Sequence, residues 1–153
     1  MSQTTRVRKV DQNGLKVGQA ITIILLLLAF VLSSPLLVAL VAICQLLGAL
    51  DLSLAPYRLI YKSVLVPAGI VRPKIETDNP EPHRFAMLVG AVFNGAAVAF
   101  LALGLPVVAW TLVWIVIVLA NLNFWLNFCA GCWMYYQFNR LGIPGFTAAK
   151  LTD

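Results

Sequence analysis

Four apolar stretches without a single charged residue constrain this chain more than any other feature. They cover residues 17–32, 35–50, 85–103 and 106–128. A helix rises about 1.5 Å per residue, so about 20 residues cross the hydrocarbon core of a bilayer. The second pair reaches that length, whereas the first pair is short and requires local bilayer thinning or snorkelling of flanking residues such as Lys16. The sequence therefore predicts four transmembrane helices.

The composition places the chain in a membrane rather than in water. Of its 153 residues, 61% are hydrophobic and 11% are charged, and the mean hydropathy is +0.89. A water-soluble domain of this size would expose much of that apolar surface, so we interpret residues 1–153 as one integral membrane domain in a lipid bilayer. The net charge of +5 fits contact with anionic headgroups, and we expect no nucleic-acid partner.

Two short turns divide the four spans into two hairpins. Residues 33–34 separate the first two spans, and residues 104–105 separate the last two. Pro35 and Pro106 follow these turns, and proline is favoured at the first helical position because the N–H that it lacks would have no partner there. We therefore predict an all-α fold, with four transmembrane helices arranged as two tight antiparallel hairpins.

The charged residues predict the orientation of these hairpins. Four basic residues precede the first span, five lie between the second and third spans, and two follow the fourth span, namely Arg6, Arg8, Lys9, Lys16, Arg58, Lys62, Arg72, Lys74, Arg84, Arg140 and Lys150. The six acidic residues lie in the same three segments, and the hairpin turns carry no charge. With four spans these segments share one side of the membrane, which the positive-inside rule makes cytoplasmic. We expect a multi-pass protein of the cell (plasma) membrane with both termini in the cytoplasm.

Residues 51–84, between the hairpins, are too numerous for a simple turn. After Pro56, apolar and aromatic side chains recur at helical spacing, at Tyr57, Ile60, Tyr61 and Val64. This pattern predicts a short amphipathic helix lying in the membrane interface, with its rings at headgroup depth. Further prolines favour an extended path after it, and Asn79 with Pro80 predicts that the third helix starts before its apolar stretch.

A Cys-x-x-Cys motif, Cys129 and Cys132, lies at the end of the fourth span. No proline or charge interrupts the sequence earlier, so we predict that the fourth helix continues to about residue 139. About 20 residues counted from Pro106 end near Trp125, which puts both cysteines at the cytoplasmic boundary. A spacing of three residues places the two sulfur atoms on one helix face.

Three interpretations of the cysteine pair are open at this point. The cysteines can be small buried residues that pack against another helix, or thiols that exchange with a cytoplasmic redox or sulfur-carrying protein. They can also be half of a metal site, but two further ligands would be needed and His83 is the only histidine. A mid-helix position lacks the helix N-terminus that activates a thiol, so a cation such as Arg84 or Arg140 would have to activate it. We expect no resident metal or cofactor.

Polar residues in and beside the spans are further candidates. Asn94, Asn123 and Asn127 are amides in apolar helices, which we interpret as helix–helix adhesion, with a pocket for a polar substrate or a quinone as the alternative. Asn123 and Asn127 share a helix face from which the cysteines should point away. His83 and Arg84, at the foot of the third span, are candidate contacts for an anion or a substrate, with an interfacial anchor as the alternative.

Three segments resemble a family of bacterial membrane proteins. They are residues 10–13 (Val-Asp-Gln-Asn), residues 78–86 (Asp-Asn-Pro-Glu-Pro-His-Arg-Phe-Ala) with Gly90 after them, and residues 128–136 (Phe-Cys-Ala-Gly-Cys-Trp-Met-Tyr-Tyr). Together they resemble the domain-of-unknown-function family 4395 over nearly the whole chain. The resemblance implies a small multi-span protein of the bacterial inner membrane with a marked Phe-Cys-x-Gly-Cys element. It implies no activity, but it favours a role for the cysteine pair because the motif falls on it.

These observations lead to two functional hypotheses. The first is a membrane-bound thiol–disulfide or sulfur-relay component in which Cys129 and Cys132 exchange with a cytoplasmic thiol or sulfur-carrier protein. Because the cytoplasm is reducing, the pair should be mostly reduced at rest. The second is a non-catalytic accessory subunit of a larger membrane complex or of a homo-oligomer, with the amides and small residues as its docking surface. The two hypotheses leave enzymatic activity open.

Overall fold

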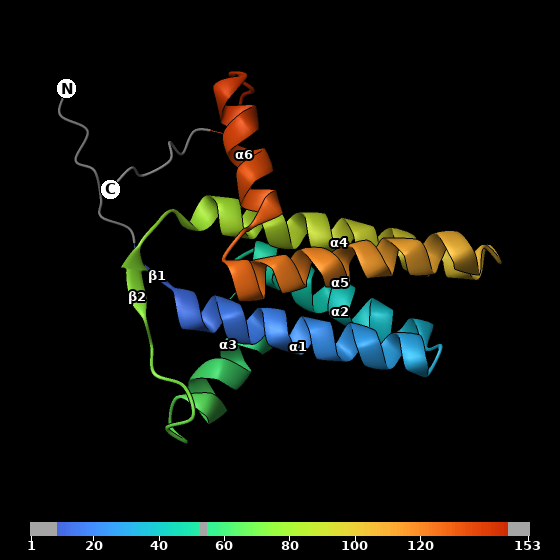
Figure 1. The fold of residues 1–153 in the computed structure, drawn as a ribbon, viewed down its shortest axis with the longest axis horizontal. Coiled ribbons are helices and arrows are strands. Elements are labelled where there is room, and N and C mark those ends of the chain that lie inside the picture. Colours follow the sequence, from blue (N-terminus) through green and yellow to red (C-terminus); the bar gives the residue numbers. More distant parts are fainter. Residues whose placement is uncertain (1–8, 53–54, 147–153) are drawn as a thin grey trace.

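Four helices packed lengthwise form the body of the molecule (Figure 1). The computed structural model describes residues 9–52 and 55–146. The four helices are α1 (Gln12–Val31), α2 (Pro35–Ala49), α4 (Pro80–Ala102) and α5 (Pro106–Leu126). They form two consecutive antiparallel pairs, which meet mainly where α2 packs on α4 and α1 packs on α5. Both hairpin turns lie at one end of this bundle, and the connection between the pairs lies at the other end.

Proline starts three of the four bundle helices, as the sequence predicts. Pro35, Pro80 and Pro106 each lie in the first turn of their helix. The preceding turns use left-handed backbone conformations, at Ser33 with a φ of 49° and at Gly104 with a φ of 77°. Such residues reverse the chain within two positions, so the helices of each pair lie side by side.

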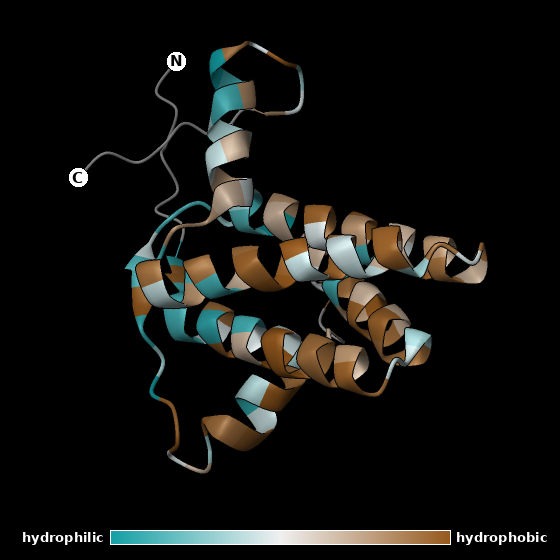
Figure 2. Cartoon of the chain, turned by 45° about the vertical axis from the view of Figure 1, so that its right-hand side comes forward, coloured by the Kyte–Doolittle hydropathy of each residue, from teal (hydrophilic) through white to brown (hydrophobic). Residues whose placement is uncertain are grey.

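The core of the bundle is built from small and branched side chains. Its buried members are Leu26, Ala29, Val38, Val41, Ala97, Ala109, Val113, Val116 and Ile117. Large apolar side chains also cover the outside of the bundle, and Val31 and Val107 are 76% and 79% exposed. Figure 2 shows hydrophobic colouring along most of the bundle and hydrophilic colouring near the end that bears the connection. An apolar outer surface of this extent suits lipid tails rather than water.

Three of the four helices, α1, α4 and α5, are long and apolar enough to cross a bilayer. α2 is also apolar but has only 15 residues. At 1.5 Å per residue it measures about 22 Å, compared with about 30 Å of hydrocarbon in a typical bilayer. The described chain is therefore mostly helical, with the lengths and composition of a membrane protein and a shorter first hairpin.

A two-stranded antiparallel sheet at the polar end of the bundle was not predicted. β1 (Lys9–Asp11) pairs with β2 (Ile75–Thr77), with Val10 opposite Glu76. Each strand has three residues, which is too few to show alternation of polar and apolar side chains. The sheet fastens the connection between the hairpins to the start of α1.

The short helix predicted after Pro56 is present in the same connection. It consists of α3 (Pro56–Ile60), which continues directly into the π-helical turn η1 (Tyr61–Leu65). Its side chains contact both α1 and α2, and the Tyr57 hydroxyl lies 3.0 Å from the Thr22 hydroxyl of α1. This segment is therefore anchored to the first hairpin, and its position in a membrane interface stays a prediction.

The fourth helix does not continue to residue 139, and that prediction was wrong. α5 ends at Leu126, Asn127 adopts a left-handed conformation with φ 52° and ψ 24°, and a separate helix, α6 (Ala130–Arg140), follows. Figures 1 and 2 both show α6 leaving the bundle at a steep angle. Asparagine tolerates the left-handed conformation better than most residues, so it can end a helix where no proline or charge stands.

Candidate functional site

The break after α5 puts Cys129 at a helix N-terminus. Cys129 is the N-cap residue of α6, and its Sγ accepts a hydrogen bond from the backbone N–H of Cys132 at 3.2 Å. The first N–H groups of a helix have no partner within the helix, and their partial positive charge favours a thiolate. The expectation that the cysteines lack this activation was wrong, because it assumed one continuous helix.

The two cysteines form a close pair with unequal exposure. They are joined as a disulfide, with their Cα atoms 5.1 Å apart. Cys132 is buried, whereas Cys129 is half-buried and lines an open cavity. The third cysteine, Cys44, is a buried free thiol in α2. Within the pair, an external molecule can thus reach the Cys129 sulfur, whereas the buried Cys132 sulfur can react with Cys129.

His83 connects the buried sulfur to a carboxylate. Its Nδ1 lies 3.5 Å from the Cys132 Sγ, and its Nε2 lies 2.8 Å from the Asp78 Oδ2. The side chain of His83 is 15% exposed and that of Asp78 is 30% exposed. A histidine between a thiol and a carboxylate is an arrangement that can accept and return a proton while it keeps one orientation.

Close packing of α6 on α4 brings these groups together. His83 lies in the first turn of α4, which begins at Pro80 directly after the connection that carries Asp78. Gly131, in the first turn of α6, faces Ala86 of α4, and a Cβ at Gly131 would lie only 2.6 Å from the Ala86 Cα. Without a glycine between the two cysteines, α6 could not approach α4 closely enough for the Cys132–His83 contact.

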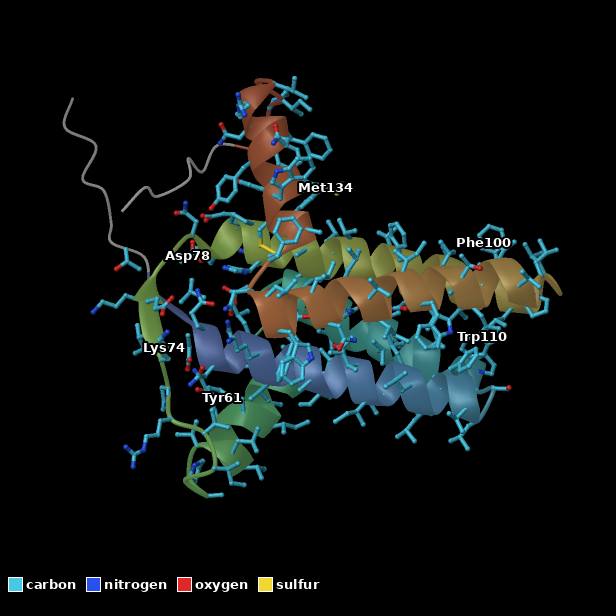
Figure 3. All side chains as sticks on the ribbon, in the orientation of Figure 1. Tyr61, Lys74, Asp78, Phe100, Trp110 and Met134 are labelled. Carbon is cyan, nitrogen blue, oxygen red and sulfur yellow. A yellow bond between two sulfur atoms is a disulfide. The ribbon has the colours of Figure 1, made fainter. Side chains whose placement is uncertain are left out.

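A polar cavity of about 370 Å³ opens beside Cys129. Its lining comes from the start of α1, the connection, the foot of α4 and the end of α5, and consists of Gln12, Asn13, Leu15, Lys16, Gln19, Lys74, Glu76, Asp78, His83, Asn123, Asn127 and Cys129. Figure 3 shows the disulfide as a yellow bond at the same end of the bundle as Asp78. Asn123, Asn127 and Cys129 thus line one cavity, although the cysteines were expected to point away from these amides.

Arg84 has a different environment from its neighbour His83. Its Nε donates a hydrogen bond to the carbonyl oxygen of Ala49, the last residue of α2, at 2.8 Å. A cation at a helix C-terminus interacts favourably with the helix dipole. Arg140 ends α6, two turns beyond Cys132. The side chain beside Cys132 in the structure is thus His83, whereas Arg84, which the sequence suggested, bonds to α2.

Asn94 lies in the bundle rather than at the cavity. It is fully buried in α4, and its Nδ2 donates a hydrogen bond to the Oε1 of Gln45 in α2 at 2.9 Å. Gly90 leaves room for this amide, since a Cβ there would lie 2.8 Å from the Gln45 Nε2. The contact joins the two hairpins through a polar pair in an otherwise apolar layer.

Three potential metal ligands meet at the site. The Sγ atoms of Cys129 and Cys132 and a ring nitrogen of His83 all lie within 4.8 Å of one another. The sequence separation between His83 and the cysteines concealed this group. Two local features were compatible with it: a left-handed Asn127 ends α5, and Gly131 lets α6 approach α4.

Comparison with known proteins identifies one match. The sequence model of a domain of unknown function, DUF4395, matches residues 10–140. No curated protein and no solved structure matches the chain. The matched range begins in β1 and ends with α6, so it includes the bundle, the sheet and the whole cysteine site.

Proposed function

This chain belongs to the DUF4395 family, whose function is not assigned, and we propose that it is a membrane-embedded thiol–disulfide exchange protein. In this proposal Cys129 is the attacking thiol, Cys132 is the resolving thiol, and His83 carries the proton of Cys132. The observation that carries the proposal is the position of Cys129 at the N-terminus of α6, with the buried Cys132 Sγ 3.5 Å from His83.

The distribution of charge supports a cytoplasmic location for the site. The residues at both hairpin turns are uncharged, and the charged residues of the described chain belong to the segments at the opposite end of the bundle. Figure 2 shows hydrophilic colouring at that end, which holds the sheet, the cavity and α6. If all four bundle helices cross the bilayer, the positive-inside rule makes the charged end cytoplasmic. α2 then crosses with its 15 residues through local thinning of the bilayer.

The shape of α6 supports a position of the cysteines at the membrane surface. α6 leaves the bundle axis steeply, so it would lie along the interface when the bundle crosses the bilayer (Figure 1). Trp133 is 54% exposed on α6, and aromatic side chains of this kind favour the headgroup region. In this arrangement the Cys129 Sγ faces the cytoplasm through the polar cavity.

In the proposed exchange reaction Cys129 reacts first and Cys132 second. The Cys129 thiolate attacks one sulfur of a partner disulfide, the partner's S–S bond breaks, and its other sulfur leaves as a thiolate that takes up a proton. Cys132 then gives its proton to His83, and its sulfur attacks Cys129, which displaces the first partner sulfur. That sulfur takes the proton from His83. The partner gains two electrons and two protons, the pair becomes a disulfide, and the reverse sequence oxidises a partner dithiol.

A trapping experiment tests the proposal. In a Cys44→Ala background, Cys132→Ser should form a stable mixed disulfide with a fluorophore-labelled peptide disulfide, whereas the intact pair should release the peptide again. Cys129→Ser should react at least about tenfold more slowly, because its remaining thiol, Cys132, is buried. Equal adduct yields from the two single variants would contradict the assigned order.

The remaining hypotheses predict different results in the same preparation. A sulfur relay predicts a persulfide on Cys129 that a sulfur donor forms and an acceptor thiol removes, which mass spectrometry detects. An accessory subunit predicts a stoichiometric partner after purification in mild detergent, with no change when both cysteines are replaced by serine. If the serine substitutions left partner binding unchanged and the cysteines were unreactive, the result would contradict thiol exchange and support the accessory-subunit function.

A further inference from the structure

We propose that the reduced cysteine pair and His83 form a binding site for one Zn²⁺ ion. The inference goes beyond thiol exchange, because it requires only the dithiol form and no partner protein. It departs from the expectation of no resident metal, which was based on the need for two further ligands when His83 is the only histidine. The fold brings His83 next to the cysteines, because the first turn of α6 packs on the first turns of α4.

The separation between Cys132 and His83 matches that of two ligands of tetrahedral zinc. Typical Zn–S and Zn–N bonds of about 2.3 Å and 2.0–2.1 Å put sulfur and nitrogen about 3.6 Å apart at two corners of a tetrahedron. The Cys132 Sγ and the His83 Nδ1 are 3.5 Å apart, and all three ligand atoms lie within 4.8 Å of one another. Reduction of the disulfide lets the two sulfurs separate while both stay on the first turn of α6.

Asp78 holds the imidazole in the orientation that a metal requires. The His83 Nε2 faces the Asp78 Oδ2 at 2.8 Å, so the Nδ1 is the nitrogen that points to the sulfurs. A histidine ligand usually donates its other N–H to a carboxylate or carbonyl, which sets the ring orientation and strengthens the metal bond. Asp78 itself accepts a hydrogen bond from the backbone N–H of Asn79 at 2.7 Å, at the start of α4. Asp78 is therefore a positioning residue for the ion.

The cavity supplies an accessible fourth position. Cys129 and His83 both line it, together with the amide of Asn127. A zinc ion with three protein ligands keeps one coordination position for water or for another ligand. The ion would thus be open to the polar cavity rather than enclosed by the chain.

Zinc and the disulfide exclude each other at this site. Binding replaces two thiol protons, so that two R–SH groups and Zn²⁺ become Zn(S–R)₂ and two protons. An oxidising disulfide takes two electrons from the two thiolates, becomes a dithiol with two protons from water, and leaves the Cys129–Cys132 disulfide and a free ion. The ion is therefore held only while the pair is reduced.

Cobalt titration of the detergent-purified chain tests the site. A Cys44→Ala variant, reduced with a phosphine that carries no thiol, should bind one Co²⁺ per chain and develop thiolate-to-cobalt charge-transfer absorption. Zn²⁺ should displace the cobalt and remove the absorption. The disulfide form should develop none. The absence of charge-transfer absorption in the reduced protein would overturn the inference.

Substitutions distinguish the metal ligands from neighbouring residues that do not bind the ion. His83→Ala and His83→Gln should each weaken Co²⁺ binding at least about tenfold, and Asp78→Asn should weaken it about 10–100-fold. Arg84→Gln is the matched control, because Arg84 is the neighbour of His83 but bonds to Ala49 in α2, and its binding should equal that of the parent. Circular dichroism verifies that each variant keeps its helices. Undiminished binding in both His83 variants would contradict the assigned ligand set.

The test distinguishes this inference from the proposed function. Exchange with the labelled peptide disulfide is measured on the same reduced protein without metal. Exchange without cobalt binding would remove the metal site and leave the proposed function. Cobalt binding without exchange would remove the proposed function and leave the metal site.

Discussion

At the residue scale, Asp11 organises the polar end of the molecule. Its Oδ1 accepts hydrogen bonds from the backbone N–H groups of Asn13, Gly14 and Lys74, which cap α1 and hold the connection. Its Oδ2 accepts a hydrogen bond from the Tyr61 hydroxyl at 2.7 Å. One carboxylate thus links the start of α1, the residue before β2 and the helical turn η1.

Tyr61 should make the stability of the folded chain sensitive to alkaline pH. Burial and the hydrogen bond to the negatively charged Asp11 raise the pKa of Tyr61 to about 12, from an ordinary value of 10. The unfolded chain therefore loses this proton at lower pH than the folded chain, and the free energy of unfolding should fall as the pH rises from about 10 to about 12. Tyr61→Phe should flatten this part of the profile, measured by denaturant unfolding in detergent. Identical profiles would contradict the prediction.

Gly131 should be required for the geometry of the cysteine site. In Gly131→Ala the new Cβ would overlap Ala86, so α6 should move away from α4 and lengthen the Cys132–His83 contact. We expect slower resolution of the mixed disulfide and weaker Co²⁺ binding, each by about tenfold or more.

Gly95→Ala provides a matched control for this substitution. Gly95 lies within α4, and a Cβ added there would meet no neighbouring atom within 4 Å in the described chain. Alanine at this position should therefore raise helix stability by up to about 1 kcal/mol. Equal effects of the two substitutions on exchange would show that close approach at Gly131 is unimportant.

At the element scale, the boundary between α5 and α6 decides the chemistry of the motif. A continuous helix would leave Cys129 and Cys132 in mid-helix, without free N–H groups nearby. The break at Asn127 instead makes Cys129 an N-cap and turns α6 across α4. A three-residue break, residues 127–129, therefore places the cysteine pair at a helix N-terminus beside His83.

Substitutions at Asn127 should test this boundary. Asn127→Gly should keep the break, because glycine adopts the left-handed conformation without strain. Asn127→Val should destabilise the chain by about 1–2 kcal/mol, because a branched side chain is disfavoured there. It should also favour continuation of α5, which would lower the reactivity of Cys129 toward iodoacetamide at neutral pH. Equal alkylation rates in the two variants would contradict the role of the break.

At the scale of the whole molecule, the bundle has one hydrophilic end and an apolar remainder. Hydrophilic residues gather at the end that holds the sheet and the cavity, and hydrophobic residues cover most of the remainder of the bundle (Figure 2). Moving a charge into hydrocarbon is costly, so this division favours one orientation across a bilayer. In that orientation the cysteine site would lie on the same side of the bilayer as the basic residues.

Labelling of introduced cysteines should establish that orientation. In a background without the three native cysteines, Ile75→Cys and Leu103→Cys place thiols at exposed positions on opposite ends of the bundle. A membrane-impermeant maleimide should label the position 103 thiol in intact cells and the position 75 thiol only in inside-out vesicles. Labelling of both from the same side would contradict the four-span arrangement and the cytoplasmic site.

Sequence alone determined the features that depend on local composition and backbone chemistry. The apolar stretches predicted the bundle helices, because a hydrophobic run without charge has few alternatives to burial or lipid. Pro35, Pro80 and Pro106 marked the starts of three helices, because the proline ring prefers the first turn. The family motif fell on Cys129 and Cys132, which the structure joins as a pair beside His83.

Tertiary structure decided everything that depends on contacts between distant segments. Three-residue strands carry no readable periodicity, so the pairing of β1 with β2 became visible only in three dimensions. The contacts among Asp78, His83 and Cys132 likewise require α6 to cross α4. A left-handed Asn127 and the absence of a side chain at Gly131 allow this packing, but the sequence does not predict it. The chain thus carries its membrane character in its composition, whereas the chemistry proposed for the cysteine site depends on a turn and a close contact that only the folded molecule defines.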